Sequence, residues 1–305
     1  MKEEGGKDIS LVDFDPEKDQ VTELWFQDSI EFGHGCSLHI KIKNVLYHSR
    51  SKFQEIVIME TEKLGRLLAI DGITMLTEYD EFAYHEMIVH VPLLVHPNPR
   101  KVLVIGGGDG GTVREIVKHP EVEEVHVCEI DEEVVAACRK YLPSLASSFD
   151  DARVKVFYED GAKYVKKSPA SYDIIIVDST DPLGPGKILF QRDFYEDMKE
   201  ALLDHGIAVT QCESIYLHPH VIRGVYSFAR DIFPKLGYYI TMVPTYPSGL
   251  IGFYFCSLSR DPVSDIDLKR ARELKGLKYY TPQLHRSSFT LPLFATDFFH
   301  SDCRE

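Results

Sequence analysis

The chain has 305 residues, of which 44% are hydrophobic and 27% are charged, as in an ordinary globular protein. Its 48 acidic residues outnumber its 34 basic ones, and the net charge of −14 argues against nucleic acid as a partner, because phosphates bind cationic surfaces. No apolar run approaches the roughly 20 residues of a membrane span. The polar start, Met1 to Gly6, lacks the apolar core of a signal peptide, so we expect a cytoplasmic protein with no membrane partner.

The cysteines are scattered along the chain without the C-x-x-C spacing of zinc or redox sites. Several lie inside apolar runs, which is typical of reduced core residues in a cytosolic protein. No group of His, Cys and Asp residues has the spacing of metal ligands, so we expect no metal. The six cysteines are Cys36, Cys128, Cys138, Cys212, Cys256 and Cys303.

Residues 1–77 are predicted to form a small antiparallel β domain, after a polar and loosely ordered start. Ser37–Lys43 and Gln54–Glu60 alternate apolar and polar side chains, as half-buried strands do. Asp71–Gly72 marks a turn between two further apolar runs. A unit of this size has a marginal core, so it must pack on the next domain or on another copy of itself.

The second domain, residues 78–305, begins with a helix over Tyr79–Leu94 and then alternates strands with helices. This alternation predicts an open, Rossmann-like parallel sheet with helices on both faces. Strands are expected at Lys101–Ile105, Val125–Glu129, Val154–Phe157, Ile174–Val177 and Ile207–Gln211. Helices are expected at Gly111–His119, Glu132–Leu142, Gly161–Lys166, Asp193–Leu203 and Pro219–Phe233.

The end of the sheet is predicted to be antiparallel. Tyr238–Val243 and Gly252–Leu258 are strand-like, and only residues 244–251 separate them. A parallel crossover needs about a dozen residues, so these two strands must form a hairpin. A doubly wound sheet that ends in such a hairpin resembles the S-adenosylmethionine-dependent methyltransferases rather than the nicotinamide dehydrogenases. After Asp261 we expect a helix near Asp265–Leu274 and an irregular, aromatic-rich tail.

A glycine-rich loop follows the first strand of this sheet. Gly106, Gly108 and Gly111 satisfy G-x-G-x-x-G between a strand and a helix, where a ligand can approach the backbone closely. Glu129 ends the next strand, where an acid can accept hydrogen bonds from ribose hydroxyls. Asp160, with Gly161 after the third strand, suits either an adenine amino group or the cap of a helix.

Acidic residues gather where the strands of the sheet end. Asp109 lies inside the glycine loop, where a carboxylate repels phosphate, and also the carboxylate of S-adenosylmethionine, but attracts an ammonium group. Asp178 and Asp181 follow the fourth strand, although Asp–Ser–Thr–Asp–Pro could also be a simple turn. All of these acids lie along the carboxyl edge of an open sheet, where ligands bind. The motifs contain no basic partner for them, so we expect an organic cation as ligand.

Five motifs in this order and spacing resemble the polyamine aminopropyltransferases, and among them the spermidine synthases most. They are G-G-G-D-G-G-T-V-R-E, V-C-E-I-D, Y-E-D-G, D-S-T-D-P-L-G-P and P-T-Y-P-S-G-L-I-G-F. The resemblance extends from about Trp25 to Phe294. It implies aminopropyl transfer from decarboxylated S-adenosylmethionine, a cosubstrate rather than a cofactor, to putrescine, which yields spermidine and 5′-methylthioadenosine. It also implies a homodimer or homotetramer.

The resemblance assigns roles to individual residues. Asp178 resembles the catalytic base, and residues 179–191 resemble a mobile gatekeeping loop. Residues that resemble contacts of the decarboxylated cosubstrate are Gln54, His85, Gly106, Gly108, Asp109, Glu129, Asp160, Gly161 and Pro185. Residues that resemble amine contacts are Tyr84, Asp109, Asp178, Asp181 and Tyr246.

The chemistry of this transfer also points to paired acids. An alkylamine has a pKa near 10 and reaches the enzyme as a cation, so it must lose a proton before it attacks the carbon next to the sulfonium. Asp178 could take that proton while Asp181 holds the amine. Cadaverine, agmatine or spermidine remain alternative acceptors, and a methyltransferase or a non-catalytic binding protein remain alternative functions. His218 and His220 are interpreted as surface residues.

Overall fold

The computed structural model describes residues 23–28, 35, 37–182 and 184–299, apart from the side chain of Pro185. The predictions for the loosely ordered start and for Cys36 and Cys303 lie outside the described residues. Among the described helices, none is long and apolar enough to cross a bilayer.

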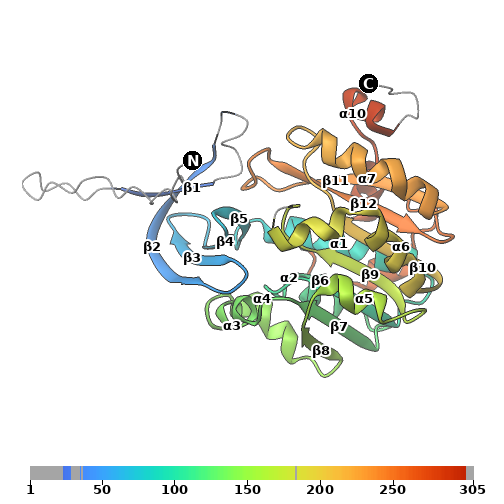
Figure 1. The fold of residues 1–305 in the computed structure, drawn as a ribbon, viewed down its shortest axis with the longest axis horizontal. Coiled ribbons are helices and arrows are strands. Elements are labelled where there is room, and N and C mark those ends of the chain that lie inside the picture. Colours follow the sequence, from blue (N-terminus) through green and yellow to red (C-terminus); the bar gives the residue numbers. More distant parts are fainter. Residues whose placement is uncertain (1–22, 29–34, 36, 183, 300–305) are drawn as a thin grey trace, which may run out of the picture.

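The first part of the chain is an antiparallel five-stranded meander, drawn in blue and light blue in Figure 1. Its strands, in spatial as well as sequence order, are β1 (Leu24–Gln27), β2 (His39–Arg50), β3 (Glu55–Thr61), β4 (Arg66–Ile70) and β5 (Ile73–Thr77). β2 is longer than expected because two register shifts against β3 interrupt its alternation. One face of the sheet, including Ile56 and Ile58, joins the core of the larger part. The opposite face, including Ile40 and Met59, forms a small cluster of its own.

The second part is a seven-stranded sheet in the order β11-β12-β10-β9-β6-β7-β8. β6 to β10 run parallel, as predicted, and β12 lies antiparallel between β10 and β11, which confirms the terminal hairpin. The strands are β6 (Lys101–Gly106), β7 (Glu124–Glu129), β8 (Val154–Tyr158), β9 (Tyr172–Asp178), β10 (Leu202–Gln211), β11 (Lys235–Met242) and β12 (Leu250–Ser257).

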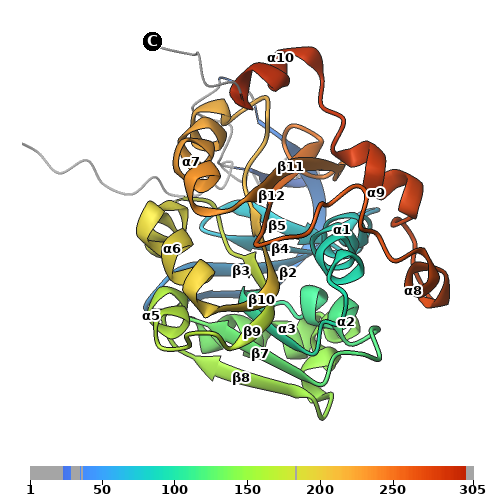
Figure 2. The same ribbon diagram turned by 90° about the vertical axis from the view of Figure 1, so that its right-hand side faces the viewer.

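Helices cover both faces of this sheet, and Figure 2 shows the two layers on either side of the strands. One face carries α1 (Glu81–Val95), α2 (Gly111–Ile116), α3 (Glu132–Tyr141) and α4 (Pro143–Ala146), whose buried side chains share one core cluster. The other face carries α5 (Gly161–Lys166), α6 (Arg192–Ala201) and α7 (Pro219–Ile232). A 3-10 turn, η2 (Ser147–Asp150), follows α4, and another, η3 (Gly184–Phe190), precedes α6.

The tail is more ordered than predicted. It forms α8 (Leu268–Glu273), α9 (Pro282–Ser288), α10 (Leu293–Thr296) and the 3-10 turn η4 (Asp297–Phe299). The helix expected at Asp265–Leu274 is therefore shorter, because Asp267 caps it by accepting hydrogen bonds from the amides of Lys269 and Arg270. Helices α9 and α10 were missed because each is too short to show helical periodicity in its sequence.

The two sheets meet at the start of α1. Asp80 accepts hydrogen bonds from the Thr77 hydroxyl at the end of β5 and from the Thr245 amide and hydroxyl in the loop between β11 and β12. Asp80 is buried, so these bonds compensate for its loss of water. They fix the start of α1, whose first two turns carry Tyr84 and His85, against the carboxyl edge of the large sheet.

Candidate active site

A cavity of about 280 Å³ opens at the carboxyl edge of the large sheet, against strands β4 and β5 of the small one. Its lining comes from nearly every loop that leaves a strand at this edge, as expected for an open α/β sheet. Of the predicted site residues it includes Gln54, Tyr84, His85, Gly106, Gly108, Asp109, Glu129, Asp160, Gly161, Asp178, Asp181 and Tyr246. Pro185 belongs to η3, but its side chain lies outside the described part of the chain.

The glycine loop lies directly against the end of β9. Gly106 has φ +81°, and a Cβ atom there would lie 2.1 Å from the backbone oxygen of Asp178. The Gly107 amide donates to that same oxygen at 2.8 Å. Only glycine fits such a contact at positive φ. The loop therefore brings Asp109 and Asp178 into the same part of the cavity.

Hydroxyl donors hold both carboxylate oxygens of Asp178. The Tyr84 hydroxyl donates to Oδ1 at 2.8 Å, and the Thr112 hydroxyl donates to Oδ2 at 2.6 Å. Burial and the charge of Asp109 raise the pKa of Asp178 above its usual value, although these two bonds act in the opposite direction. A fixed carboxylate with raised basicity is suited to accept a proton near neutral pH.

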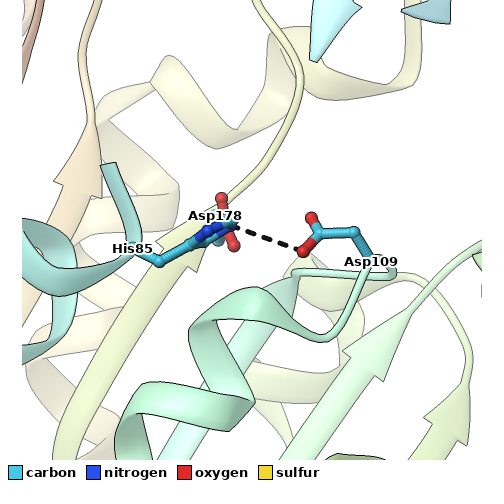
Figure 3. Close-up of side chains that lie close together, drawn as sticks. All are labelled: His85, Asp109 and Asp178. Atoms are coloured by element: carbon cyan, nitrogen blue, oxygen red, sulfur yellow. Dashed lines mark ion pairs between the residues drawn. The ribbon is translucent and has the colours of Figure 1, made fainter. Parts of the chain in front are cut away.

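Asp109 faces a buried histidine (Figure 3). Its Oδ1 atom accepts a hydrogen bond from the Gly111 amide at 2.6 Å and lies 3.4 Å from His85 Nε2. Burial alone would raise the pKa of Asp109, but His85 and the Gly111 amide lower it. Asp109 is therefore ionised at neutral pH.

His85, Asp109 and Asp178 offer ligand atoms that all lie within 4.8 Å of one another, so this group could hold a cation. The imidazole nitrogens already face Glu81 and Asp109. The acceptors that remain are carboxylate oxygens, which suit an ammonium group that donates hydrogen bonds.

The opposite end of the cavity suits a nucleoside. Glu129 lies at the end of β7 with its side chain over Gly108, and burial raises its pKa to about 7. Gln54 donates from Nε2 to the carboxylate of Asp131 at 3.1 Å, and this bond fixes the orientation of the Gln54 side-chain amide in the cavity. Asp160 accepts a hydrogen bond from the Ala162 amide and caps α5. It also lines the cavity, so the helix cap and a contact with a ligand are compatible at this residue.

A second group of acids lies beyond Asp178. Gln211 donates from Nε2 to Asp181 at 3.2 Å, and burial together with the neighbouring Glu213 raises the pKa of Asp181 well above its usual value. His218 Nδ1 lies 2.8 Å from Glu213 Oε2, and its side chain is only 17% exposed. The surface interpretation of His218 is wrong, because it lines the cavity. His220 is exposed, as expected.

Several residues around the site are not among those predicted from the sequence. Glu81 and His85 stand four residues apart in α1, so their contact could have been found from helical spacing. Thr112 and Arg114 follow the glycine loop. The contact of that loop with the end of β9 brings Thr112 to Asp178, and the packing of α1 against α2 brings Arg114 to Glu81. Glu213 has no sequence signal beyond its position after β10.

The chain matches two family descriptions. Residues 24–78 match the spermidine synthase tetramerisation domain, and residues 81–267 match the spermine/spermidine synthase domain.

Relatives and solved structures agree with these families. The chain is 47% identical to a polyamine aminopropyltransferase of Leptospira biflexa, over 90% of this chain and 97% of the relative. It is 42% identical to the spermidine synthase of Dictyostelium discoideum, over 91% and 98%. The Thermotoga maritima spermidine synthase superposes with a TM-score of 0.88 at 40% identity, over 95% and 99% of the two chains. A spermidine synthase in complex with the transition-state analogue AdoDATO superposes with a TM-score of 0.89 at 40% identity, over 92% and 98%.

Proposed function

The chain belongs to the spermine/spermidine synthase family and is an enzyme of the polyamine aminopropyltransferase class. From this premise we propose that it transfers the aminopropyl group of decarboxylated S-adenosylmethionine to putrescine. The products would be spermidine, 5′-methylthioadenosine and a proton. Decarboxylated S-adenosylmethionine is then a cosubstrate, and no separate cofactor takes part.

The observation that carries this proposal is the meeting of Asp109 and Asp178 in one cavity. Glu129 at one end suits a ribose, and Asp109 suits the ammonium of an aminopropyl tail. Asp181, three residues after Asp178, lines the same cavity and suits a second ammonium. An adenosyl ligand with a cationic tail and a diamine would thus place their reacting atoms next to Asp178.

The reaction needs one proton acceptor and good positioning. Asp178, held by Tyr84 and Thr112, takes a proton from the bound ammonium of the amine. The free amine then attacks the carbon next to the sulfonium, and the C–S electron pair stays on sulfur as the C–N bond forms. The sulfonium is already a good leaving group, so the enzyme supplies positioning and a base, and holding both reactants in one cavity replaces a bimolecular encounter.

The segment 179–191 is proposed as the lid of this cavity. Ile188 and Leu189 in η3 belong to the lining, so this part of the segment forms part of the wall. An apolar wall over the reacting atoms would exclude water and strengthen the charge interactions beneath it.

The decisive test is product analysis by mass spectrometry with decarboxylated S-adenosylmethionine and four amines: putrescine, cadaverine, agmatine and spermidine. We expect spermidine and 5′-methylthioadenosine, with the highest kcat/KM for putrescine. A higher kcat/KM for another amine would change the acceptor but keep the reaction class. A methylated product from ordinary S-adenosylmethionine would overturn the proposal. A chelator such as EDTA is expected to leave the rate unchanged.

We further propose that the active form is a homodimer or homotetramer in the cytoplasm. The first sheet, residues 24–77, falls within the match to the tetramerisation domain. Its first two strands expose large apolar side chains, Trp25 of β1 at 50% and Val45 of β2 at 44%, which suit a contact between copies.

A further inference from the structure

Four charged side chains of alternating sign form a row that ends in the cavity. Arg114 donates from Nη1 and Nη2 to the two oxygens of Glu81 at 2.8 and 2.9 Å. Glu81 Oε2 lies 2.6 Å from His85 Nδ1, and His85 Nε2 lies 3.4 Å from Asp109 Oδ1. Glu81 and His85 are 5% and 2% exposed, so water does not separate the charges.

The imidazole of His85 is held in one orientation. Its ring lies on the backbone of Gly111, where an added Cβ atom would be 2.3 Å from Cε1. The ring of Tyr84 meets it nearly at right angles, with centroids 5.3 Å apart. Each ring nitrogen therefore faces a carboxylate oxygen, and both nitrogens can satisfy these acceptors only when both carry a proton.

We propose that His85, as an imidazolium paired with Glu81, which Arg114 in turn anchors, occupies the ammonium-binding face of Asp109 in the empty enzyme, and that binding of the cationic tail drives one proton off His85. This inference rests on the proposed function, because it takes decarboxylated S-adenosylmethionine as the ligand. His85 is then a positioning and specificity residue whose charge is exchanged for that of the cosubstrate.

The charges around His85 support this exchange. It is faced by Glu81 from its own helix, by Asp109 from the glycine loop, and by Asp178 from β9, while Arg114 of α2 lies behind Glu81. Burial lowers the pKa of His85, but Asp109 and Glu81 together raise it to about 10. An ammonium placed beside Asp109 shares this carboxylate with the imidazolium, and two cations in a low-dielectric site repel each other strongly. Release of the imidazolium proton to solvent removes the repulsion and leaves a neutral ring.

The test is isothermal titration calorimetry at pH 8 in two buffers with different ionisation enthalpies, which gives the number of protons released on binding. At this pH Glu129, with a pKa of about 7, is already largely ionised, whereas His85 is still protonated. Decarboxylated S-adenosylmethionine is compared with 5′-methylthioadenosine, which lacks the aminopropyl group. We expect the decarboxylated ligand to release about one proton more than methylthioadenosine.

His85→Gln keeps a polar side chain but removes the titrating group, so the difference between the two ligands should fall to zero. His48→Gln is the matched control, since His48 also pairs with a glutamate, Glu55, but is exposed on the first sheet; it should keep the difference. Methylthioadenosine affinity and Tm show that each variant is folded. In ¹⁵N-histidine spectra, the His85 nitrogens should change from imidazolium to neutral imidazole shifts when the decarboxylated ligand binds.

The outcomes separate the two proposals. If decarboxylated S-adenosylmethionine fails to bind the wild-type protein, the proposed function is overturned. If it binds with no more proton release than methylthioadenosine, or if His85→Gln retains the difference, the exchange at His85 is overturned while the proposed function stands.

Discussion

Both oxygens of the Asp178 carboxylate are already bonded to hydroxyl groups, so the proton of the amine must be taken by a remaining lone pair. Asp178→Asn keeps the size of the side chain but cannot accept this proton at the same position. We expect kcat to fall by about 10²–10⁴-fold, the range for loss of a general base. Binding of 5′-methylthioadenosine, measured by calorimetry, should change little. Turnover near that of the wild type would show that another group is the base.

Glu129 should make nucleoside binding depend on pH. Burial raises its pKa to about 7 in the empty enzyme, whereas hydroxyl groups that donate to it favour the ionised form. The affinity for 5′-methylthioadenosine should therefore rise as the pH increases through about 7 and level off above it. Glu129→Gln should bind more weakly and lose this dependence. If the affinity of Glu129→Gln for 5′-methylthioadenosine varied with pH as that of the wild type does, another group would be the cause of the pH dependence.

At the scale of elements, the contact between the glycine loop and β9 should be both structural and catalytic. In Gly106→Ala the new methyl group would meet the Asp178 backbone oxygen, and the residue would keep an unfavourable positive φ. We expect a loss of at least about 1–2 kcal/mol in the free energy of unfolding, from the backbone conformation alone, and a fall in kcat because Asp178 moves.

The matched control is Gly224→Ala in the middle of α7, where nothing lies within 4 Å of the added methyl group. Alanine is favoured over glycine inside a helix, so the free energy of unfolding of this variant should rise by up to about 1 kcal/mol. Urea unfolding measures this free energy for both variants. Equal stability of the two variants would contradict the role of the glycine loop.

The order of strands and helices could be predicted because each parallel strand is a continuous apolar run, whereas the apolar residues of each crossover helix recur at helical spacing. The length of β2 could not, because bulges against β3 hide its alternation. Residues that follow strands, such as Asp109 and Asp178, are brought together by topology and were predictable. Arg114 reaches Glu81 through packing between two helices distant in sequence, which no local pattern records. His218 lies only five residues after Glu213, so its place beside the site follows from its position after β10.

At the scale of the whole molecule, the exposed apolar residues of the first sheet predict assembly. Val45→Asp places a charge in the proposed contact between copies and should lower the molar mass measured by light scattering. Val263→Asp, at a residue 39% exposed near α8, is the matched control and should leave the mass unchanged. Wild-type protein that runs as a single chain would contradict the proposed oligomer.

The position of β12 has a consequence for how the chain is made. β12 is the last strand among the described residues, yet it lies inside the sheet, paired with β10 over residues 207–211 and with β11 along its whole length. During synthesis, β10 therefore keeps an open edge until residues beyond 250 have left the ribosome. An unpaired, apolar strand edge is a site for association with other chains. The nascent enzyme is thus most exposed to misassembly late in translation, after nearly all of its cavity-lining residues have been synthesised.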